Sequence, residues 1–264
     1  MQLRNLTKIL ILASFLVSIP AFAQTPAPAK TPAKAPAKAA SKAPAAAKAP
    51  FDPALLHPET LKLRAPAEFD VKFVTTAGDF TMHVTRAWAP QGADRLYNLV
   101  RHHYYDGNAF FRVLSGFMAQ FGMSAFPQVS AAWDDANIKD DPVVQSNDRG
   151  FVSFAMAGPN TRTTQLFINY RNNAPLDKSG FAPFAQVTDG MDVVDKLYNA
   201  YGEGAPDGKG PNQGLIMSQG KSYLESSFPK LDVIKTTTLV LPAAPAATAT
   251  PAAKAPAKTP PANQ

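Results

Sequence analysis

The chain has 264 residues, with 26 Lys or Arg against 20 Asp or Glu and a formal net charge of +6. Nine of the basic residues lie outside residues 51–241, whereas all 20 acidic residues lie inside, so this segment carries a net charge of −3. A mildly acidic globule argues against nucleic-acid binding, which needs a basic surface. A chain with 0 cysteines forms no disulfide.

The N-terminal residues have the pattern of a secretory signal. Arg4 and Lys8 precede the apolar stretch 9–19, and Ala21-Phe22-Ala23 is a small-x-small cleavage pattern. This pattern predicts a signal peptide over residues 1–23, cleaved after Ala23, and a periplasmic or secreted protein. The apolar stretch is short for a membrane span, and an uncleaved anchor is the alternative.

Two arms of biased composition flank the middle of the chain. Residues 24–50 and 242–264 consist mainly of Ala, Pro, Lys, Ser and Thr, and their prolines exclude a continuous helix. Such segments bury too little apolar surface to fold, so we expect a disordered linker and a disordered tail. Their lysines suit weak electrostatic contact with an anionic cell envelope, and a plain solubilising spacer is the alternative.

The region between the arms is long enough for one domain, residues 69–241, preceded by a lead-in segment, residues 51–68. Apolar residues alternate over 71–75 and 80–84, on either side of Ala77-Gly78, which predicts a β-hairpin. Further strands are expected within residues 110–122, 151–169, 184–187 and 231–241.

Two helices are expected between these strands. Apolar residues at helical spacing begin at Pro90 and end before Asp106-Gly107, and a second such stripe runs over 191–198. Residues 124–149 are expected to form loops. Many strands with only two helices predict a mainly β protein, a closed antiparallel barrel plugged by helices. We expect a monomer.

The stretch FFRVLSGFMAQFG, residues 110–122, places one arginine and one glutamine in an otherwise apolar run. The guanidinium of Arg112 must therefore find acceptors or line a cleft. Met118 and Gln120 share one face of the strand, and Gln165 shares a face with Phe167 in a second run. These faces together predict an apolar pocket rimmed by two amides and one guanidinium. A salt-bridged barrel arginine and exposed glutamines are the alternative.

Three segments in order carry a family resemblance: FFRVLSGFMAQFG, FAMAGPNTRTTQLFI and LDKSGFAPFAQVTDGMDVVD. They resemble the cyclophilin family of peptidyl-prolyl cis-trans isomerases, over about residues 69–239. The resemblance implies an eight-stranded barrel with a helix over each end, and a catalytic guanidinium at Arg112. It further implies a substrate site made of Phe117, Met118, Gln120, Ala155, Met156, Ala157, Gln165, Phe167 and Leu176.

Within that site the implied roles differ. Phe117, Met118, Phe167 and Leu176 would form the proline pocket, and the two glutamines would hold peptide groups. Ala155 and Ala157 match the segment that pairs with the peptide backbone, where Met156 replaces the usual asparagine.

Two further departures affect the pocket. Pro175 stands where many members have tryptophan, and the family's pocket histidine falls near Gly180 or Phe181. These departures leave the isomerase interpretation intact and argue against strong cyclosporin binding.

Other candidate sites fail on their spacing. The loop 202–214 is rich in glycine, but Glu203 and Gly210 occupy positions where a phosphate-binding loop needs Gly and Ser or Thr. His102 and His103 are adjacent and cannot chelate one metal from a helix. Ser153 lacks the flanking glycines of a nucleophile elbow. No metal or cofactor is therefore expected.

The expected function is isomerisation of X-Pro bonds in exported proteins during folding. Rotation about that bond breaks no covalent bond, so it requires no nucleophile, metal or cofactor. A non-catalytic module that binds proline segments and an envelope-tethered structural protein are the alternatives. Ala-Pro pairs in both arms, such as Ala35-Pro36 and Ala255-Pro256, are plausible ligands for the chain's own pocket.

Overall fold

The computed structural model describes residues 49–241, all within one compact unit. The predicted signal peptide, nearly all of the linker and the tail lie outside the described residues. Within 49–241 no helix is both long enough and apolar enough to cross a membrane.

Eight strands form one sheet in which every pairing is antiparallel. They are β1 (Glu68–Thr75), β2 (Asp79–Thr85), β3 (Arg112–Leu114), β4 (Met118–Phe121), β5 (Phe151–Phe154), β6 (Leu166–Asn169), β7 (Pro183–Asp189) and β8 (Ile234–Val240). Their order across the sheet is β3-β4-β6-β5-β7-β2-β1-β8. The mainly β prediction and the number of strands are therefore confirmed.

The sheet is curled but open between its two end strands, β3 and β8. A single bridge, Ala109 to Val233, joins the segments that precede them. The amide of Phe110 donates to the carbonyl of Asp232 at 3.0 Å beside this bridge. Because β3 is only three residues long, β3 and β8 do not pair with each other in the described residues. The predicted full closure of the barrel is not confirmed.

The predicted hairpin is present and supplies much of the core. In β1 the residues alternate between buried and more exposed, and Phe73 lies opposite Phe80 of β2. Their rings stack with centroids 4.7 Å apart. Phe110 and Phe121 extend this aromatic cluster from the β3–β4 side, with centroids 5.0 Å apart. Buried aromatic area of this kind is a main source of stability in a chain without disulfides.

The helices differ from the prediction of two. The described residues contain six α-helices: α1 (Pro90–Arg101), α2 (Pro127–Trp133), α3 (Pro175–Lys178), α4 (Met191–Asp195), α5 (Gln213–Gln219) and α6 (Lys221–Ser227). Two 3₁₀ turns, η1 (Pro53–Leu56) and η2 (Pro58–Thr60), precede the sheet.

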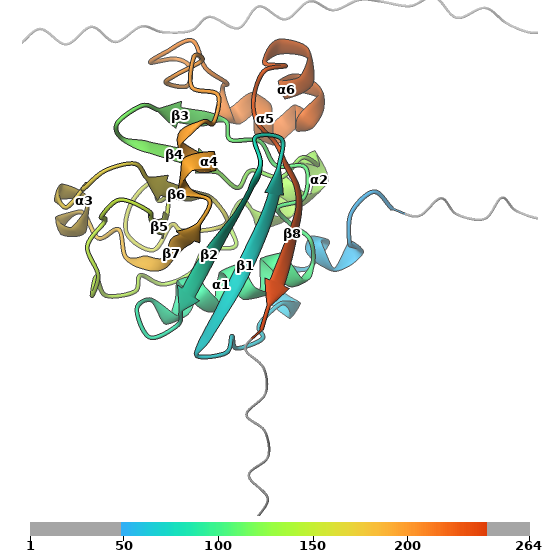
Figure 1. Ribbon diagram of the computed structural model, residues 1–264. Helices are drawn as coiled ribbons and strands as arrows, with labels where there is room; N and C mark the ends of the chain where they lie inside the picture. Colours follow the sequence, from blue (N-terminus) through green and yellow to red (C-terminus); the bar gives the residue numbers. More distant parts are fainter. Residues whose placement is uncertain (1–48, 242–264) are drawn as a thin grey trace, which may run out of the picture. The chain divides into compact units, whose positions relative to one another are not determined.

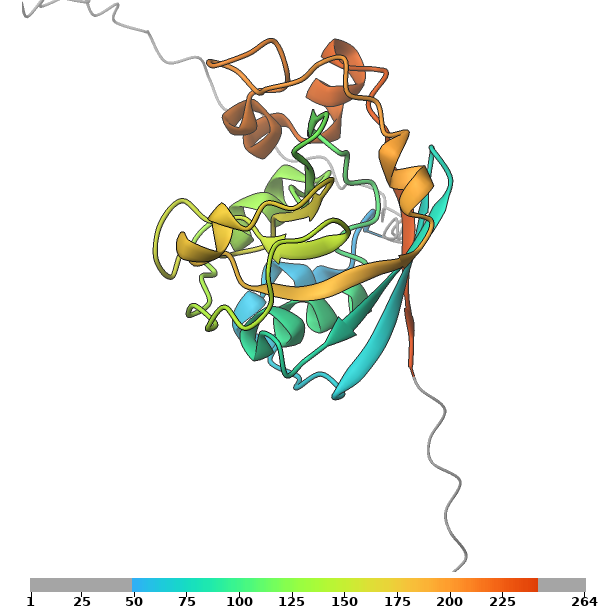
Figure 2. The ribbon, with the colours of Figure 1, turned by 60° about the vertical axis from the view of Figure 1, so that its left-hand side comes forward.

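Helix α1 begins at Pro90 and ends at Arg101, before Asp106 as predicted, and His103 just beyond it takes a left-handed φ of 56°. Helix α4 covers only part of the stripe predicted over 191–198, and α2 lies within the expected loop 124–149. Helices α5 and α6 lie together at one end of the sheet and α1 lies at the other (Figures 1 and 2).

Gly122, which follows β4, is a position where backbone geometry requires glycine. Its φ is +103°, and a Cβ there would lie 2.5 Å from the carbonyl oxygen of Thr164. We expect Gly122→Ala to lower the free energy of unfolding by about 2 kcal/mol, from the left-handed φ and the steric clash together. Gly116→Ala is the matched control, because Gly116 has a φ of +68° and nothing within 4 Å of that Cβ. Urea unfolding of both variants measures the difference, and equal losses would contradict a role for the clash.

Candidate active site

A cavity of about 160 Å³ opens beside β3, β4 and β6. It is lined by Arg112, Phe117, Met118, Gln120, Ala155, Met156, Phe167, Leu176 and Phe181. The sheet brings these residues together because β4 lies between β3 and β6, with Gln120 opposite Arg112 on one side and opposite Phe167 on the other. The apolar lining and its size suit one small apolar ring.

Arg112 lies at the rim of this cavity, which we call the apolar pocket. Its Nη1 donates to Oε1 of Gln120 at 3.2 Å and lies 3.8 Å from Sδ of Met118. The amide of Gln120 in turn donates to Oε1 of Gln165 at 2.8 Å. The guanidinium and both glutamines are therefore on the same side of the sheet, as the sequence predicts.

The other edge of the same guanidinium is held by a carboxylate. Nε and Nη2 of Arg112 donate to Oε1 and Oε2 of Glu203, each at 2.6 Å. This hydrogen bonding lowers the pKa of Glu203 below its ordinary value of 4.5, although burial acts in the opposite direction. One N–H on each terminal nitrogen has no oxygen acceptor among residues 49–241, so Arg112 retains donors for a ligand.

The loop that carries Glu203 is folded tightly around it. The backbone carbonyl of Glu203 accepts from the amide of Gly210 at 2.7 Å, and its side chain accepts from the amide of Gly204 at 2.9 Å. A Cβ at Gly208 would lie 2.3 Å from the Glu203 carbonyl oxygen, so the backbone can approach this closely only with glycine there. The glycines that suggested a phosphate loop therefore position a carboxylate.

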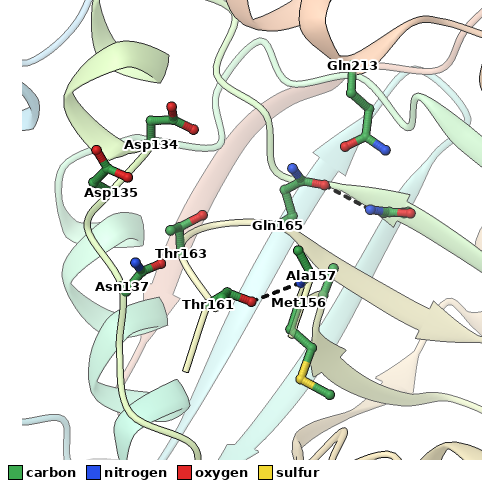
Figure 3. A pocket seen from close by; sticks show the side chains of 11 residues that line it. Asp134, Asp135, Asn137, Met156, Ala157, Thr161, Thr163, Gln165 and Gln213 are labelled. Atoms are coloured by element: carbon green, nitrogen blue, oxygen red, sulfur yellow. Dashed lines mark hydrogen bonds between the residues drawn. The ribbon is translucent and has the colours of Figure 1, made fainter. Parts of the chain in front are cut away.

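A second cavity of about 460 Å³ adjoins the apolar pocket, and the two share Gln120, Ala155 and Met156. Figure 3 shows Asp134 and Asp135 on one side of it, facing Gln165 across the cavity. We call it the acidic cavity.

The structure brings all ten predicted site residues to these two adjoining cavities. Eight line the apolar pocket, and Ala157 and Gln165 line only the acidic cavity. The N–H groups of Ala155 and Ala157 are already bonded, to the Gln165 carbonyl and to Oγ1 of Thr161, each at 2.9 Å. A bound peptide would therefore have to use other groups of this segment, such as the carbonyl of Ala155 or the N–H of Met156.

Sequence reasoning missed residues that hold the apolar pocket in shape. The carbonyl of Phe117 accepts from the amide of Tyr170 and from Nδ2 of Asn173, each at 2.9 Å. Asn173 is buried and also donates to the side chain of Asn169 at 2.8 Å. Buried amides that are fully bonded fix a backbone tightly, and no local pattern marks them.

The serine and histidines that the sequence analysis excluded as catalytic or metal-binding residues make contacts within the fold. Oγ of Ser153 is buried and donates to Oδ1 of Asn147 at 2.8 Å. His102 pairs with Asp52 at 2.7 Å, and His103 contacts Asp106. Among the described residues no group of three or more His, Cys, Asp or Glu side chains could hold a metal ion.

Comparison with known proteins identifies the class. The family model of cyclophilin-type peptidyl-prolyl cis-trans isomerases matches residues 70–218. The peptidyl-prolyl cis-trans isomerase cyp18 of Streptomyces antibioticus is 34% identical over 137 residues, covering 48% of this chain and 81% of that protein. Peptidyl-prolyl cis-trans isomerase B of Escherichia coli is 30% identical over 172 residues, covering 62% of this chain and 94% of that protein.

Among solved structures, a cyclophilin-type isomerase of Cryptosporidium parvum is 21% identical with a TM-score of 0.49, covering 67% of this chain and 99% of that one. The family model and the relative from Escherichia coli show that the chain belongs to the cyclophilin-type peptidyl-prolyl cis-trans isomerases. Its activity is isomerisation of the X-Pro peptide bond, which favours the enzyme over the non-catalytic alternatives.

Proposed function

We propose that this isomerase acts on exported proteins and that Arg112 stabilises the twisted X-Pro bond over the apolar pocket. The observation that carries the proposal is the position of Arg112, at the rim of a cavity lined mainly by apolar side chains and beside Gln120. In a planar imide the prolyl nitrogen is not an acceptor. As the bond twists, the lone pair returns and can accept from a guanidinium, so the donor acts selectively on the transition state.

The energies required are within reach of such a site. The uncatalysed barrier is about 18 to 20 kcal/mol, and a ~10⁴-fold acceleration needs about 5.5 kcal/mol of differential stabilisation. One hydrogen bond from a charged donor contributes about 1.5 to 3 kcal/mol. Transfer of the imide into the apolar pocket, where the less polar twisted form loses less solvation, supplies the remainder.

The apolar lining is assigned to binding of the proline ring. Phe117 is half-buried at the rim of the pocket. We expect Phe117→Ala to raise KM about fivefold, because about 40 Å² of lost apolar contact is worth about 1 kcal/mol, and to change kcat less. Leu114→Ala is the control, since Leu114 is also half-buried but lies outside the pocket lining. Steady-state isomerisation of an Ala-Pro peptide measures both, and an unchanged KM for Phe117→Ala would remove that residue from the site.

Export is supported by the sequence pattern of residues 1–23, with the cleavage motif ending at Ala23. Fractionation of cells that express the full chain, with N-terminal sequencing of the product, tests it. A periplasmic or secreted product that begins at Gln24 supports the proposal. A full-length product in the cytoplasm would reject export while leaving the isomerase activity untouched.

A further inference from the structure

A third cavity, of about 390 Å³, lies between the lead-in segment and helix α1. It is lined by Pro58 and residues 61–63 of the lead-in segment, by residues of α1 that include Arg95, and by residues 137–139. Figure 2 shows the first described residues, in blue, beside α1. We call it the lead-in cavity. It shares no lining residue with the apolar pocket, so its role is separate from the binding of proline.

The lead-in wall of this cavity is held firmly on α1. The buried side chain of Asn98 accepts from the amide of Leu63 at 3.0 Å and donates to the carbonyl of Leu63 at 2.7 Å. The amide of Ala65 donates to Oδ1 of Asp94 at 2.8 Å. The family model begins to match only at residue 70. Membership of the family therefore does not account for this wall.

Arg95 is a half-buried cation without a carboxylate partner among residues 49–241. Its Nη1 donates to the carbonyls of Ala136 and Thr163, each at 2.7 Å, whereas its Nε and Nη2 form no hydrogen bond with the described residues. The arms contain no Asp or Glu that could pair with it. A guanidinium held this way retains the edge that binds the two oxygens of an anion.

Two other arginines show what this edge does when an anion is present. Nε and Nη2 of Arg86 donate to the two oxygens of Asp94, at 2.7 and 2.8 Å, and Arg112 holds Glu203 in the same way. Hydrogen bonding to Asp94 raises the pKa of Arg86, whereas burial lowers the pKa of Arg95 to about 10. An anion beside Arg95 would offset this cost of burial.

Two lysines add to the positive charge of the lead-in cavity. Lys62 and Lys139 are exposed, line the cavity and form no ion pair within residues 49–241. The one carboxylate in the lining, Asp94, is already neutralised by Arg86. Three cations without a free carboxylate favour a ligand that carries two negative charges over one that carries a single charge.

The remaining lining suits an organic molecule that carries such a group. The side-chain amides of Gln91 and Asn137 form no hydrogen bond within residues 49–241 and can donate to oxygen. Leu61, Leu63 and Ile138 supply apolar contacts. The volume of the cavity lies in the usual range of small-molecule sites, about 300–1,000 Å³.

We propose that the lead-in cavity binds a phosphate monoester group, carried by a small organic molecule or by a lipid headgroup. Nε and Nη2 of Arg95 hold two phosphate oxygens, and Lys62 and Lys139 balance the second negative charge. The leucines of the lead-in segment contact the organic part.

The first test is titration calorimetry of the full chain with phenyl phosphate, inorganic phosphate and benzoate at low salt. At about pH 8 a phosphate monoester is a dianion, because its second pKa is about 6. We expect phenyl phosphate to bind about tenfold more tightly than benzoate, which has the same ring and one charge. It should also bind more tightly than inorganic phosphate, which lacks an apolar part. Equal affinities for phenyl phosphate and benzoate, or no binding of either, would overturn the proposal.

The second test assigns that binding to the lead-in cavity. Lys62→Glu/Lys139→Glu reverses two of the three cations and should weaken binding of phenyl phosphate at least about tenfold. The matched change Lys230→Glu/Lys235→Glu, at exposed lysines outside the cavity, should leave the affinity unchanged. Equal weakening by both double variants would show general surface attraction and reject the site.

Arg95→Lys tests the guanidinium edge, because lysine keeps the charge and loses the planar fork. We expect weaker binding of phenyl phosphate, and circular dichroism shows whether the fold survives the loss of the contacts with Ala136 and Thr163. If this variant unfolds, the comparison of the two lysine double variants still decides the proposal.

Vesicles distinguish a lipid headgroup from a soluble ester. Phosphatidylcholine vesicles that contain phosphatidic acid present a phosphate monoester, whereas those with phosphatidylglycerol present a phosphodiester. Sedimentation of the full chain with the first but not the second, lost in Lys62→Glu/Lys139→Glu, assigns a lipid headgroup. Binding of phenyl phosphate without sedimentation assigns a soluble ester. Sedimentation that this variant leaves unchanged would reject the cavity as a lipid site.

Discussion

Replacing Arg112 with alanine is expected to lower kcat/KM on an Ala-Pro peptide by tenfold or more. The guanidinium is the only cation that lines the apolar pocket in the described structure, and its loss removes a charged donor worth about 1.5 to 3 kcal/mol. The fold should survive, because the partner Glu203 is 37% exposed and water can solvate it when Arg112 is gone. A protease-coupled isomerisation assay, with circular dichroism as a check on folding, measures the effect.

Two variants separate the geometry of this donor from its charge. Arg112→Lys keeps a positive charge but loses the planar fork that engages Glu203 and Gln120 at once, so we expect it to recover only part of the activity. Arg149→Ala removes an arginine that is also ion-paired, with Asp195 at 2.6 Å, but lies outside the pocket lining. Its activity should match the unmodified enzyme. If the Arg112→Ala enzyme kept the kcat/KM of the unmodified enzyme, Arg112 could not be the catalytic residue.

Much of this site could be predicted because its residues lie in short strands with local patterns. Met118 and Gln120 share a face through the two-residue period of β4, and both line the apolar pocket. The alternation of apolar and polar residues likewise predicted the β1–β2 hairpin. The helices were harder, since α2, α5 and α6 are each seven residues long, which is about two turns and too short for a clear period.

The contact between Arg112 and Glu203 could not be predicted, because it joins residues 91 apart through a loop without periodic structure. Glycine spacing showed that the loop is not a phosphate site, but it did not show where the loop folds. The same holds for Asn173, whose contact with Phe117 depends on the pairing of β4 with β6. Local patterns identify which residues share a face, whereas long-range pairing decides which faces meet.

Glu203→Ala is expected to lower kcat/KM by about tenfold, and to do so through Arg112. The carboxylate has two opposing effects: it fixes the guanidinium through two hydrogen bonds of 2.6 Å, and it weakens the field of the cation. The reacting imide is neutral and gains no net charge as it twists, so the direction of the N–H donors matters more than the net charge. Loss of orientation should therefore outweigh the stronger field.

Three variants distinguish this positioning role from a direct effect of the carboxylate on the substrate or a general loss of loop structure. Glu203→Gln still offers one oxygen acceptor and should retain more activity than Glu203→Ala. The double variant Arg112→Ala/Glu203→Ala should be no slower than Arg112→Ala alone, because a positioning residue has nothing left to position. Asp207→Ala, at an exposed position in the same loop, should have no effect. A rise in kcat/KM for Glu203→Ala would show that the carboxylate restrains catalysis.

The pH dependence of the enzyme provides a further test of the same contact. Because hydrogen bonding to Arg112 lowers the pKa of Glu203 below 4.5, the carboxylate is ionised and the ion pair intact throughout the neutral range. Its contribution is present above that pKa and is lost as the pH falls through the lowered value. NMR exchange should therefore show no effect of Glu203 ionisation on kcat/KM from neutral pH down to about pH 5. At pH values below 4.5, the ordinary pKa of this group, kcat/KM should fall. Glu203→Ala should lack that acid limb, and an identical acid limb in both enzymes would assign it to another carboxylate.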